Sequence, residues 1–185
     1  MIQFLVLFLS ISAFSDVTLT NLKGLVKVND KEVVEGAVAK SKDTISAEGK
    51  GSSVQITFDD KSRTLLRNGK LVIREDDIEK KSIISLLGGI IFVSKEKSQR
   101  DLKVKTKFAV MGIRGTKFYV EEKETDSYLC VYEGVVEIQN LKSTAIVEKD
   151  EDVMVSLGKP FKKTSAKKEM RQIAREGFIE MGVLK

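Results

Sequence analysis

The sequence lacks the residues on which several kinds of catalytic and metal site depend. It has no histidine and only one cysteine, Cys130, among 185 residues. A Ser-His-Asp triad, a Cys-His pair and any histidine-bearing zinc site are therefore excluded, as are an intramolecular disulfide and a C-x-x-C site. A carboxylate pair or a serine–lysine dyad remains open by counting, but neither has a recognisable pattern here. We expect a protein that binds rather than catalyses, without a cofactor.

Acidic residues occur in short runs that could supply calcium ligands. The runs are Asp59-Asp60, Asp76-Asp77 and residues 148–152. A protein calcium site needs about six to eight oxygens from a loop with carboxylates at alternate positions followed by glycine. None of the runs has that spacing, and Lys149 interrupts the longest one. We interpret the runs as solvated turns and expect no metal site.

Composition is otherwise that of an ordinary globular domain. Hydrophobic residues make up 42% and charged residues 32%, so a packed core is expected. Aromatic residues are scarce at 6%, and tryptophan is absent. The net charge of +5 would suit an anionic lipid, glycan or nucleic acid, although solubility alone explains it.

The first residues are apolar over a short stretch. Residues 2–14 are interrupted only by Gln3, Ser10 and Ser12, which is too short for a good membrane-spanning helix of about 20 residues. Small residues at 13 and 15 then precede Asp16, as at a signal-peptide cleavage site. We expect residues 1–15 to be a signal peptide rather than a buried first strand. Export would place the chain in the periplasm, with no transmembrane span after cleavage and no nucleic acid as a partner.

Residues 17–157 alternate between apolar and polar side chains with the period of β-strands. Val54, Ile56 and Phe58 fall on one face of such a strand, and Cys130 lies in an apolar run where we expect it to be buried. Asn68-Gly69 predicts a type I′ hairpin turn between residues 65–67 and 70–73. Residues 78–87 fit a short helix or a strand, before Gly88-Gly89 and a further strand. The pattern predicts an all-β sandwich, barrel or solenoid.

The C-terminal residues change period. After Pro160, the only proline, apolar residues recur at helical spacing. They are Ala166, Met170, Ile173, Ala174, Gly177, Phe178 and Met181. We expect a β domain over residues 16–158, and a linker with an amphipathic helix over 159–185. The helix either caps an open end of the β domain, which we favour, or docks on a partner or on anionic lipid.

One segment resembles a known family. Residues 109–116, Ala-Val-Met-Gly-Ile-Arg-Gly-Thr, are similar to the core motif of the FecR-type domain of bacterial envelope proteins. Residues 131–136 resemble the strand-turn-strand that follows that motif, and weaker similarity extends the match over about residues 16–158. Lys42 and Lys61 stand where the family usually has glycine.

The resemblance implies a fold and a function. The fold would be a compact, β-helix-like or sandwich-like all-β domain. The function would be non-enzymatic: a protein-interaction, signalling or scaffolding module of the cell envelope that binds an unknown envelope protein. Fuller members of the family carry a cytoplasmic anti-sigma segment and a transmembrane helix before this domain. Neither is recognisable here, so we expect a stand-alone periplasmic domain and leave a link to sigma-factor signalling open.

Two sets of residues are candidates for a site. The family motif comprises Gly112, Arg114, Gly115, Thr116, Glu133 and Gly134. It could form a recognition loop in which Arg114 binds a carboxylate or phosphate. We favour a structural turn in which Arg114 pairs with Glu133.

The second set is Lys103, Lys105 and Lys107, which alternate along one strand. These lysines could form a face that binds polyanions, or they could guard a free strand edge against pairing with other chains, which we favour. The alternative function is therefore a binding module for cell-wall glycan or another polyanionic envelope polysaccharide.

Overall fold

A computed structural model describes residues 16–76, 81–96 and 101–185, with only the backbone of Asp76 and Arg114. The predicted signal peptide lies outside the described residues. The described chain forms strands and one C-terminal helix, which confirms the predicted all-β class with its amphipathic helix. The elements are β1 (Val17–Val28), β2 (Lys31–Glu32), β3 (Val38–Ala39), β4 (Thr44–Thr57), β5 (Arg63–Asp76), β6 (Lys81–Ser94), β7 (Asp101–Lys105), β8 (Val110–Glu122), β9 (Asp126–Gln139), β10 (Thr144–Glu148), β11 (Glu151–Ser156), β12 (Lys162–Ser165) and α1 (Lys168–Glu180).

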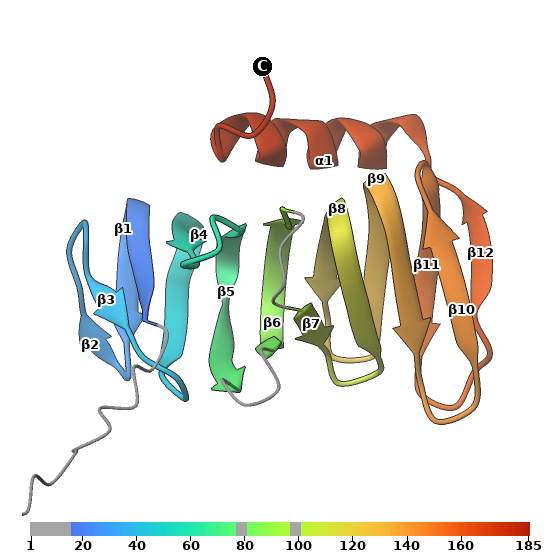
Figure 1. Cartoon of the computed structure of the whole chain (residues 1–185), viewed down its shortest axis with the longest axis horizontal. Coiled ribbons are helices and arrows are strands. Elements are labelled where there is room, and N and C mark those ends of the chain that lie inside the picture. Colours follow the sequence, from blue (N-terminus) through green and yellow to red (C-terminus); the bar gives the residue numbers. More distant parts are fainter. Residues whose placement is uncertain (1–15, 77–80, 97–100) are drawn as a thin grey trace, which may run out of the picture.

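The strands stand side by side in nearly the order of the sequence (Figure 1). Their hydrogen-bonding order is β12-β11-β9-β8-β7-β6-β5-β4-β1-β2, with β10 paired to β9 and β3 to β1. Neighbours are antiparallel except β6 and β7, which are parallel. Most contacts therefore join strands that are close in the sequence, and the domain is a row of long hairpins.

The long strands bend midway, and their two halves form two layers. Register shifts interrupt the pairing of β4, β5, β6, β8 and β9 near their midpoints. Residues with positive φ lie at these shifts, because a bulged strand needs a backbone that turns sharply. They are Gly49, Gly51, Asn68, Gly89, Gly115 and Gly134.

Strand pairing defines the membership of each layer. The first, here called the helix-covered layer, contains residues 53–57, 63–67, 90–94, 117–122 and 127–133 with β11 and β12. The second, here called the open layer, contains β2, residues 44–47, 70–76, 81–88, β7, 110–114, 135–139 and β10. Strand β7 is inserted between β6 and β8 in the open layer, whereas β6 and β8 pair directly in the helix-covered layer.

The main core lies between the two layers. Alternating residues point inward from each long strand, among them Val54, Ile56, Leu129 and Val131, all at most 1% exposed. Fully burying a side chain of this size stabilises the fold by about 1.5–3 kcal/mol. The predicted face of Val54, Ile56 and Phe58 is confirmed, since Phe58 is also buried.

The hairpin predicted at Asn68-Gly69 is wrong. Both residues lie inside β5, which continues from Arg63 to Asp76 and pairs with β4 and β6 on both sides of this point. Asn68 does adopt a positive φ of 46°, but it forms a bulge rather than a reversal. A Cβ on Gly69 would lie 2.2 Å from the carbonyl oxygen of Gly88, so β5 and β6 bend together at this crossing.

Helix α1 crosses the strands at the top of the view (Figure 1) and contacts β6, β8 and β9. It covers a second apolar cluster on the outer face of the helix-covered layer, where Phe92 and Tyr119 stack with ring centroids 5.5 Å apart. Phe178 of the helix meets the Phe92 ring edge-on at 6.1 Å. Cys130 is fully buried in this cluster, as predicted.

The helix and the residues before it differ in three ways from what we expected. It packs on the face of the central strands rather than capping an open end of the β domain, because the aromatic residues that it covers lie on β6, β8 and β9. The residues expected to link it to the domain include a strand, β12, which pairs with β11. Ile173, predicted on the apolar stripe, is 37% exposed. No helix of the described residues is both long and apolar enough to cross a bilayer.

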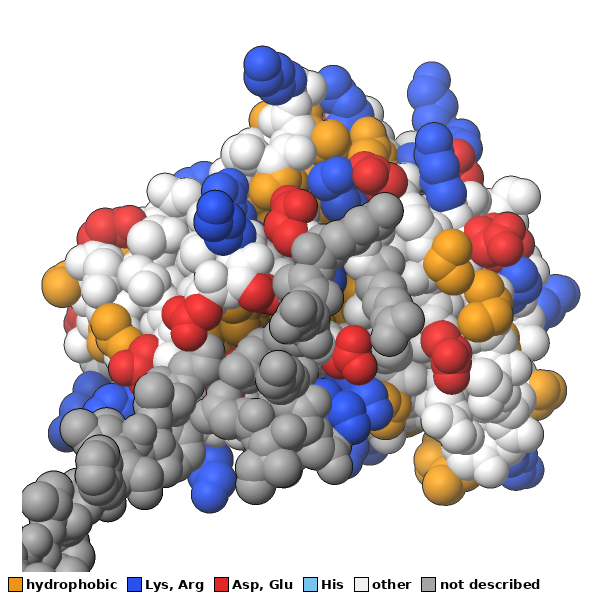
Figure 2. Space-filling model, in the orientation of Figure 1, with side chains coloured by type: hydrophobic (Ala, Val, Ile, Leu, Met, Phe, Trp, Pro, Cys, Tyr) orange, Lys and Arg blue, Asp and Glu red, His pale blue; other side chains and the backbone are white. Residues whose placement is uncertain are grey.

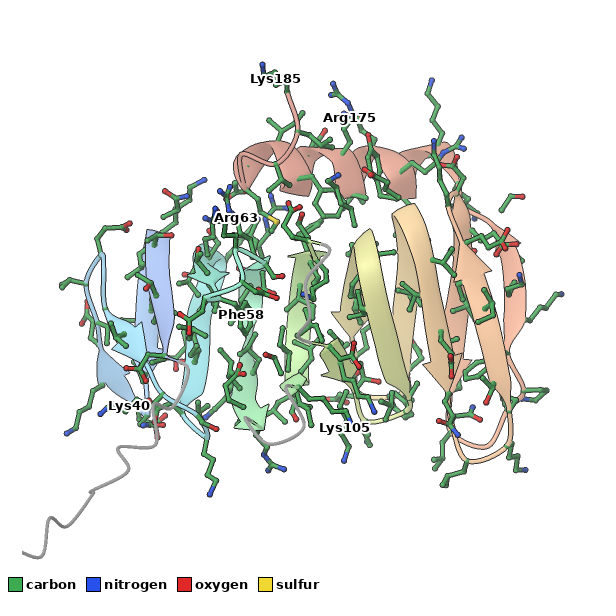
Figure 3. All side chains as sticks on the ribbon, in the orientation of Figure 1. Lys40, Phe58, Arg63, Lys105, Arg175 and Lys185 are labelled. Carbon is green, nitrogen blue, oxygen red and sulfur yellow. The ribbon has the colours of Figure 1, made fainter. Side chains whose placement is uncertain are left out.

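Charged groups fix the C-terminal end of α1. The Glu180 carboxylate accepts hydrogen bonds from Arg67 and from Lys23, the latter at 2.9 Å. The Arg67 guanidinium also lies 4.6 Å from the centroid of the Phe92 ring. Arg63, which Figure 3 places just below the helix, donates to the Met181 carbonyl at 3.2 Å. Burial acts to raise the pKa of Glu180, but the bonds from Lys23 and Arg67 outweigh it, and the pKa is lowered.

This ion-pair cluster predicts an acid-dependent stability. A lowered pKa in the folded state gives a stabilisation that is complete above the ordinary carboxyl pKa of 4.5 and is lost as the pH falls through the folded-state value. We expect Glu180→Gln to cost about 1 kcal/mol near neutral pH. Thermal unfolding of both proteins from neutral to acidic pH should show this difference shrinking toward zero. A difference that stays constant below the ordinary carboxyl pKa would contradict this role of Glu180.

Candidate functional site

The outer face of the open layer is not covered by the helix. Strand pairing places a row of residues across this face, from β5 to β10. The row consists of Arg74, Ile83, Lys103, Gly112, Glu137 and Ile146. Successive members come from six different strands, so the fold gathers them although they span much of the sequence.

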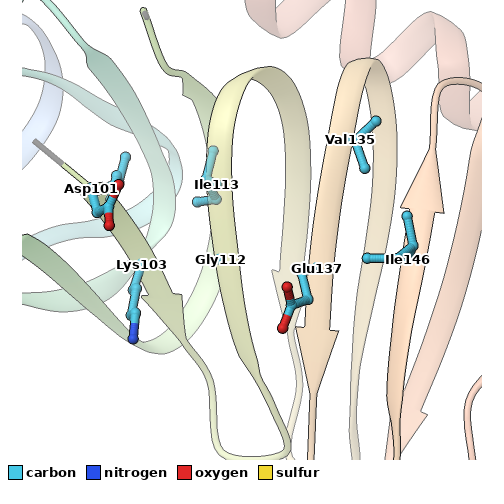
Figure 4. Close-up of a pocket in the computed structure, with 8 residues that line it drawn as sticks. Asp101, Lys103, Gly112, Ile113, Val135, Glu137 and Ile146 are labelled. Carbon is cyan, nitrogen blue, oxygen red and sulfur yellow. The ribbon is translucent and has the colours of Figure 1, made fainter. Parts of the chain in front are cut away.

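A hollow interrupts this row at Gly112, which has no side chain (Figure 4). The hollow measures about 400 Å³ and is here called the Gly112 hollow. Lys103 on β7 and Glu137 on β9 flank Gly112 on opposite sides. Val135 and Ile146 form an apolar wall and are 45% and 44% exposed. Among the described residues, neither Lys103 nor Glu137 has an ion-pair partner, so both charges can bind another molecule.

The fold itself does not require glycine at position 112. Its φ lies outside the left-handed region, and the nearest atom to an added Cβ would be the Glu137 carbonyl oxygen, 4.0 Å away. That distance is an ordinary contact. Glycine is unfavourable inside a strand, because it has more freedom to lose on folding and no side chain to pack. A glycine at a partly exposed position, where the fold would accept a larger residue, suits close approach by another backbone.

The other glycines of the family motif have a structural role. Gly115 has a φ of 58° at the bulge of β8, and Gly134 has a φ of 86° on β9 beside it. A Cβ on Gly134 would lie 2.4 Å from the methyl carbon of Thr116, which is 1% exposed. The Gly115-Thr116 segment and Gly134 therefore interlock where β8 and β9 bend from one layer to the other. They form a bend within paired strands rather than a turn between strands.

The proposed pairing of Arg114 with Glu133 involves a side chain outside the described residues. The backbone of Arg114 pairs with Val135. The Glu133 carboxylate accepts a hydrogen bond from Lys117 at 2.5 Å. In the described part of the chain, the partner found for Glu133 is thus Lys117.

The three alternating lysines do not guard a free strand edge, so that interpretation is wrong. Strand β7 pairs with β6 on one side and β8 on the other. The edge could not be judged from the sequence because β8 brings its second partner from residues 110–113. The lysines also divide between two hollows: Lys103 lines the Gly112 hollow, whereas Lys105 and Lys107 line a neighbouring groove.

The neighbouring groove lies at the end of β7 and measures about 920 Å³. A buried carboxyl group, Glu122, forms part of its wall and is 6% exposed. It accepts hydrogen bonds from the Ser127 hydroxyl and from the Lys107 amide. Burial raises the pKa of Glu122, and these two bonds only partly oppose the shift. Glu122 thus ties the β7–β8 connection to the β8–β9 hairpin.

Sequence reasoning missed the apolar wall of the Gly112 hollow. The alternation of residues 135–139 could have placed Val135 and Glu137 on the outer face. Nothing local indicated that Ile146 of β10 would lie beside them. As for metals, the described residues contain no group of three or more histidine, cysteine, aspartate or glutamate side chains that could hold an ion.

Comparison with known proteins identifies the family. The model of the FecR protein family matches residues 43–137, slightly more than half of the chain. No curated protein matches.

Two crystal structures of a putative anti-sigma factor from Parabacteroides distasonis ATCC 8503 are similar in fold. Their TM-scores are 0.58 and 0.57, at 20% and 19% sequence identity. The matches cover 66% and 65% of this chain, and in both cases 59% of the P. distasonis chain. This similarity concerns the fold alone. The resemblance of the 109–116 motif is thus confirmed by the family match, and the chain belongs to the FecR protein family, which is generally non-enzymatic.

Proposed function

We propose that this protein is a non-enzymatic interaction module of the bacterial cell envelope, which binds another envelope protein through the Gly112 hollow. The observation that carries the proposal is Gly112 itself: a partly exposed strand glycine that neither the backbone conformation nor neighbouring atoms require. Its position within the family motif supports the same conclusion. Export to the periplasm by the predicted signal peptide is part of the proposal.

The chemistry of the hollow suits a protein partner. Two half-exposed apolar side chains, Val135 and Ile146, offer a surface whose burial would favour association. Lys103 and Glu137 carry opposite charges on either side of it. Such a pair selects a partner with the complementary arrangement of charges, whereas a simple polyanion would be repelled by Glu137.

The role of the bound complex is proposed to be signalling or scaffolding. The P. distasonis protein of similar fold is described as a putative anti-sigma factor. The present chain spans 59% of that protein. In this proposal, a regulatory connection to a sigma factor would run through the protein that the Gly112 hollow binds.

Filling the hollow tests the proposal. We expect Gly112→Leu to abolish capture of the envelope partner by the tagged full chain from detergent-solubilised envelope, read by mass spectrometry at low and high salt. The unfolding midpoint should stay within about 3 °C of the original, because an added Cβ would meet no atom closer than 4.0 Å and the rest of the side chain would enter the hollow. Capture of the partner by the unsubstituted protein should persist at high salt if apolar contacts dominate the interface.

Lys162→Leu is the matched control, since it adds an exposed leucine on β12 in the other layer. It should leave capture unchanged. Capture of the same protein by Gly112→Leu would overturn the proposal. Recovery of salt-labile cell-wall material alone would instead favour the alternative function in glycan binding.

A further inference from the structure

The groove beside the Gly112 hollow is rich in cations and is here called the basic groove. Arg74, Lys105, Lys107 and Lys123 line it, together with the carboxyl groups of Glu122 and Glu124. Basic side chains stand along the lower edge of the molecule (Figure 2), where Figure 3 places Lys105. The groove therefore presents more positive than negative charge to a ligand.

The cations of the basic groove are mostly free of internal partners. Among the described residues, no ion pair involves Arg74 or Lys105. The Lys107 ammonium donates to the Glu124 carbonyl at 3.2 Å and lies 5.4 Å from the centroid of the Phe108 ring. The Lys123 ammonium lies 3.3 Å from the carboxylate of Glu121. A surface ion pair such as Lys123–Glu121 contributes little to stability, about 0–1 kcal/mol, so Lys123 can leave Glu121 and pair with a ligand instead.

The carboxyl groups do not neutralise these cations equally. Both oxygens of Glu122 accept hydrogen bonds from within the chain, and the side chain is buried. It thus builds the wall of the groove and holds Lys107 in place. Glu124 is exposed at the rim. An excess of positive charge remains over the groove, toward which an anionic ligand would be drawn.

An apolar side chain stands among the cations. Leu87, on β6, is 59% exposed and lines the basic groove. Arg74 on β5 and Lys105 on β7 lie on the two strands that flank β6. Arg74 pairs with Ile83 and Lys105 with Ser85, two residues further along β6, so their backbones are roughly 12 Å apart. That separation corresponds to about four residues of an extended peptide. A segment with carboxylates at that spacing and an apolar side chain between them would match both features.

We propose that the basic groove binds an acidic, extended peptide segment of the partner protein. This inference rests on the proposed function, because the groove continues the face of the open layer that holds the Gly112 hollow. Arginine and lysine clusters recognise acidic motifs through charge-assisted hydrogen bonds. The exposed leucine favours a peptide over a polysaccharide, since a peptide supplies apolar side chains beside its carboxylates.

The test uses the full chain and a fluorescent peptide of about ten residues, in which glutamates alternate with serines and one central leucine. Fluorescence anisotropy at low salt should show binding, and the peptide with glutamine in place of glutamate should not bind. We expect Arg74→Gln combined with Lys105→Gln to weaken binding by about tenfold or more. Lys31→Gln combined with Lys162→Gln removes the same charge from exposed sites on β2 and β12 and should change binding less than about twofold.

Each other outcome overturns the inference. Equal weakening by both double variants would show a non-specific effect of net charge. Tighter binding of an oligogalacturonate with the same number of carboxylates would identify a glycan as the ligand. Absence of peptide binding, while Gly112→Leu still abolishes capture of an envelope protein, would refute the acidic segment and leave the proposed function standing.

Discussion

Replacing Gly134 by alanine is expected to lower the free energy of unfolding by about 2–4 kcal/mol. The added Cβ would lie 2.4 Å from the Thr116 methyl carbon and 2.7 Å from the Gly115 carbonyl oxygen. It would also force a side chain onto a backbone with a φ of 86°. Thr116 is buried between the strands and the carbonyl belongs to the bend of β8, so neither can move without disturbing both layers.

Gly112→Ala is the matched control, since it lies in the same family motif and on the same strand as Thr116. Its Cβ would meet no atom closer than 4.0 Å, and we expect a change of less than about 1 kcal/mol. Urea unfolding of the two variants beside the original protein measures both effects. Similar stabilities for the two variants would contradict the division of the motif into a structural bend and a recognition position.

The fold class could be predicted because its evidence is local. Alternation of apolar residues shows on each strand separately, as at Val54, Ile56 and Phe58, and the helical spacing after Pro160 marks α1. These patterns depend only on which side chains face a core. They did not indicate that each long strand contributes to two layers, since the inward positions continue on both sides of the bends.

The bends could not be predicted because a bulge and a hairpin turn use the same residues. Asn68-Gly69 offers a positive φ to either structure. The outcome depends on pairing of β5 with β4 and β6, and on the contact of Gly69 with Gly88 some twenty residues later. A sequence pattern read within a few residues contains none of this information.

The candidate site could be predicted only in part, because the role of each residue depends on contacts with distant strands. The motif and the lysines stood out as unusual runs, but only the packing shows that Gly112 is free of internal constraint whereas Gly134 is not. Likewise, Lys103 and Lys105 are neighbours in alternation yet line different hollows. The assignment of a residue to structure or to recognition therefore required its neighbours from other strands.

The attachment of α1 gives the second large expected effect, at Gly177. Alanine in place of glycine normally stabilises a helix by about 1 kcal/mol. Here a Cβ would lie 2.3 Å and 2.4 Å from two carbons of the Phe92 ring. That ring is fully buried, stacked on Tyr119 and covered by Arg67, so it cannot move aside. We expect Gly177→Ala to destabilise the docked helix by about 2–3 kcal/mol, opposite in sign to the helix propensity.

The thiol of Cys130 provides a direct measurement of docking. It is fully buried in the cluster that α1 covers, and burial raises its pKa to about 11. Both features suppress reaction with a thiol reagent. Gly177→Ala should increase the rate of Cys130 modification by about tenfold or more, whereas Arg175→Ala, at an exposed position of the same helix, should leave it unchanged. A slower reaction in Gly177→Ala would show that helix propensity outweighs the contact with Phe92, and that glycine is not required where α1 meets the strands.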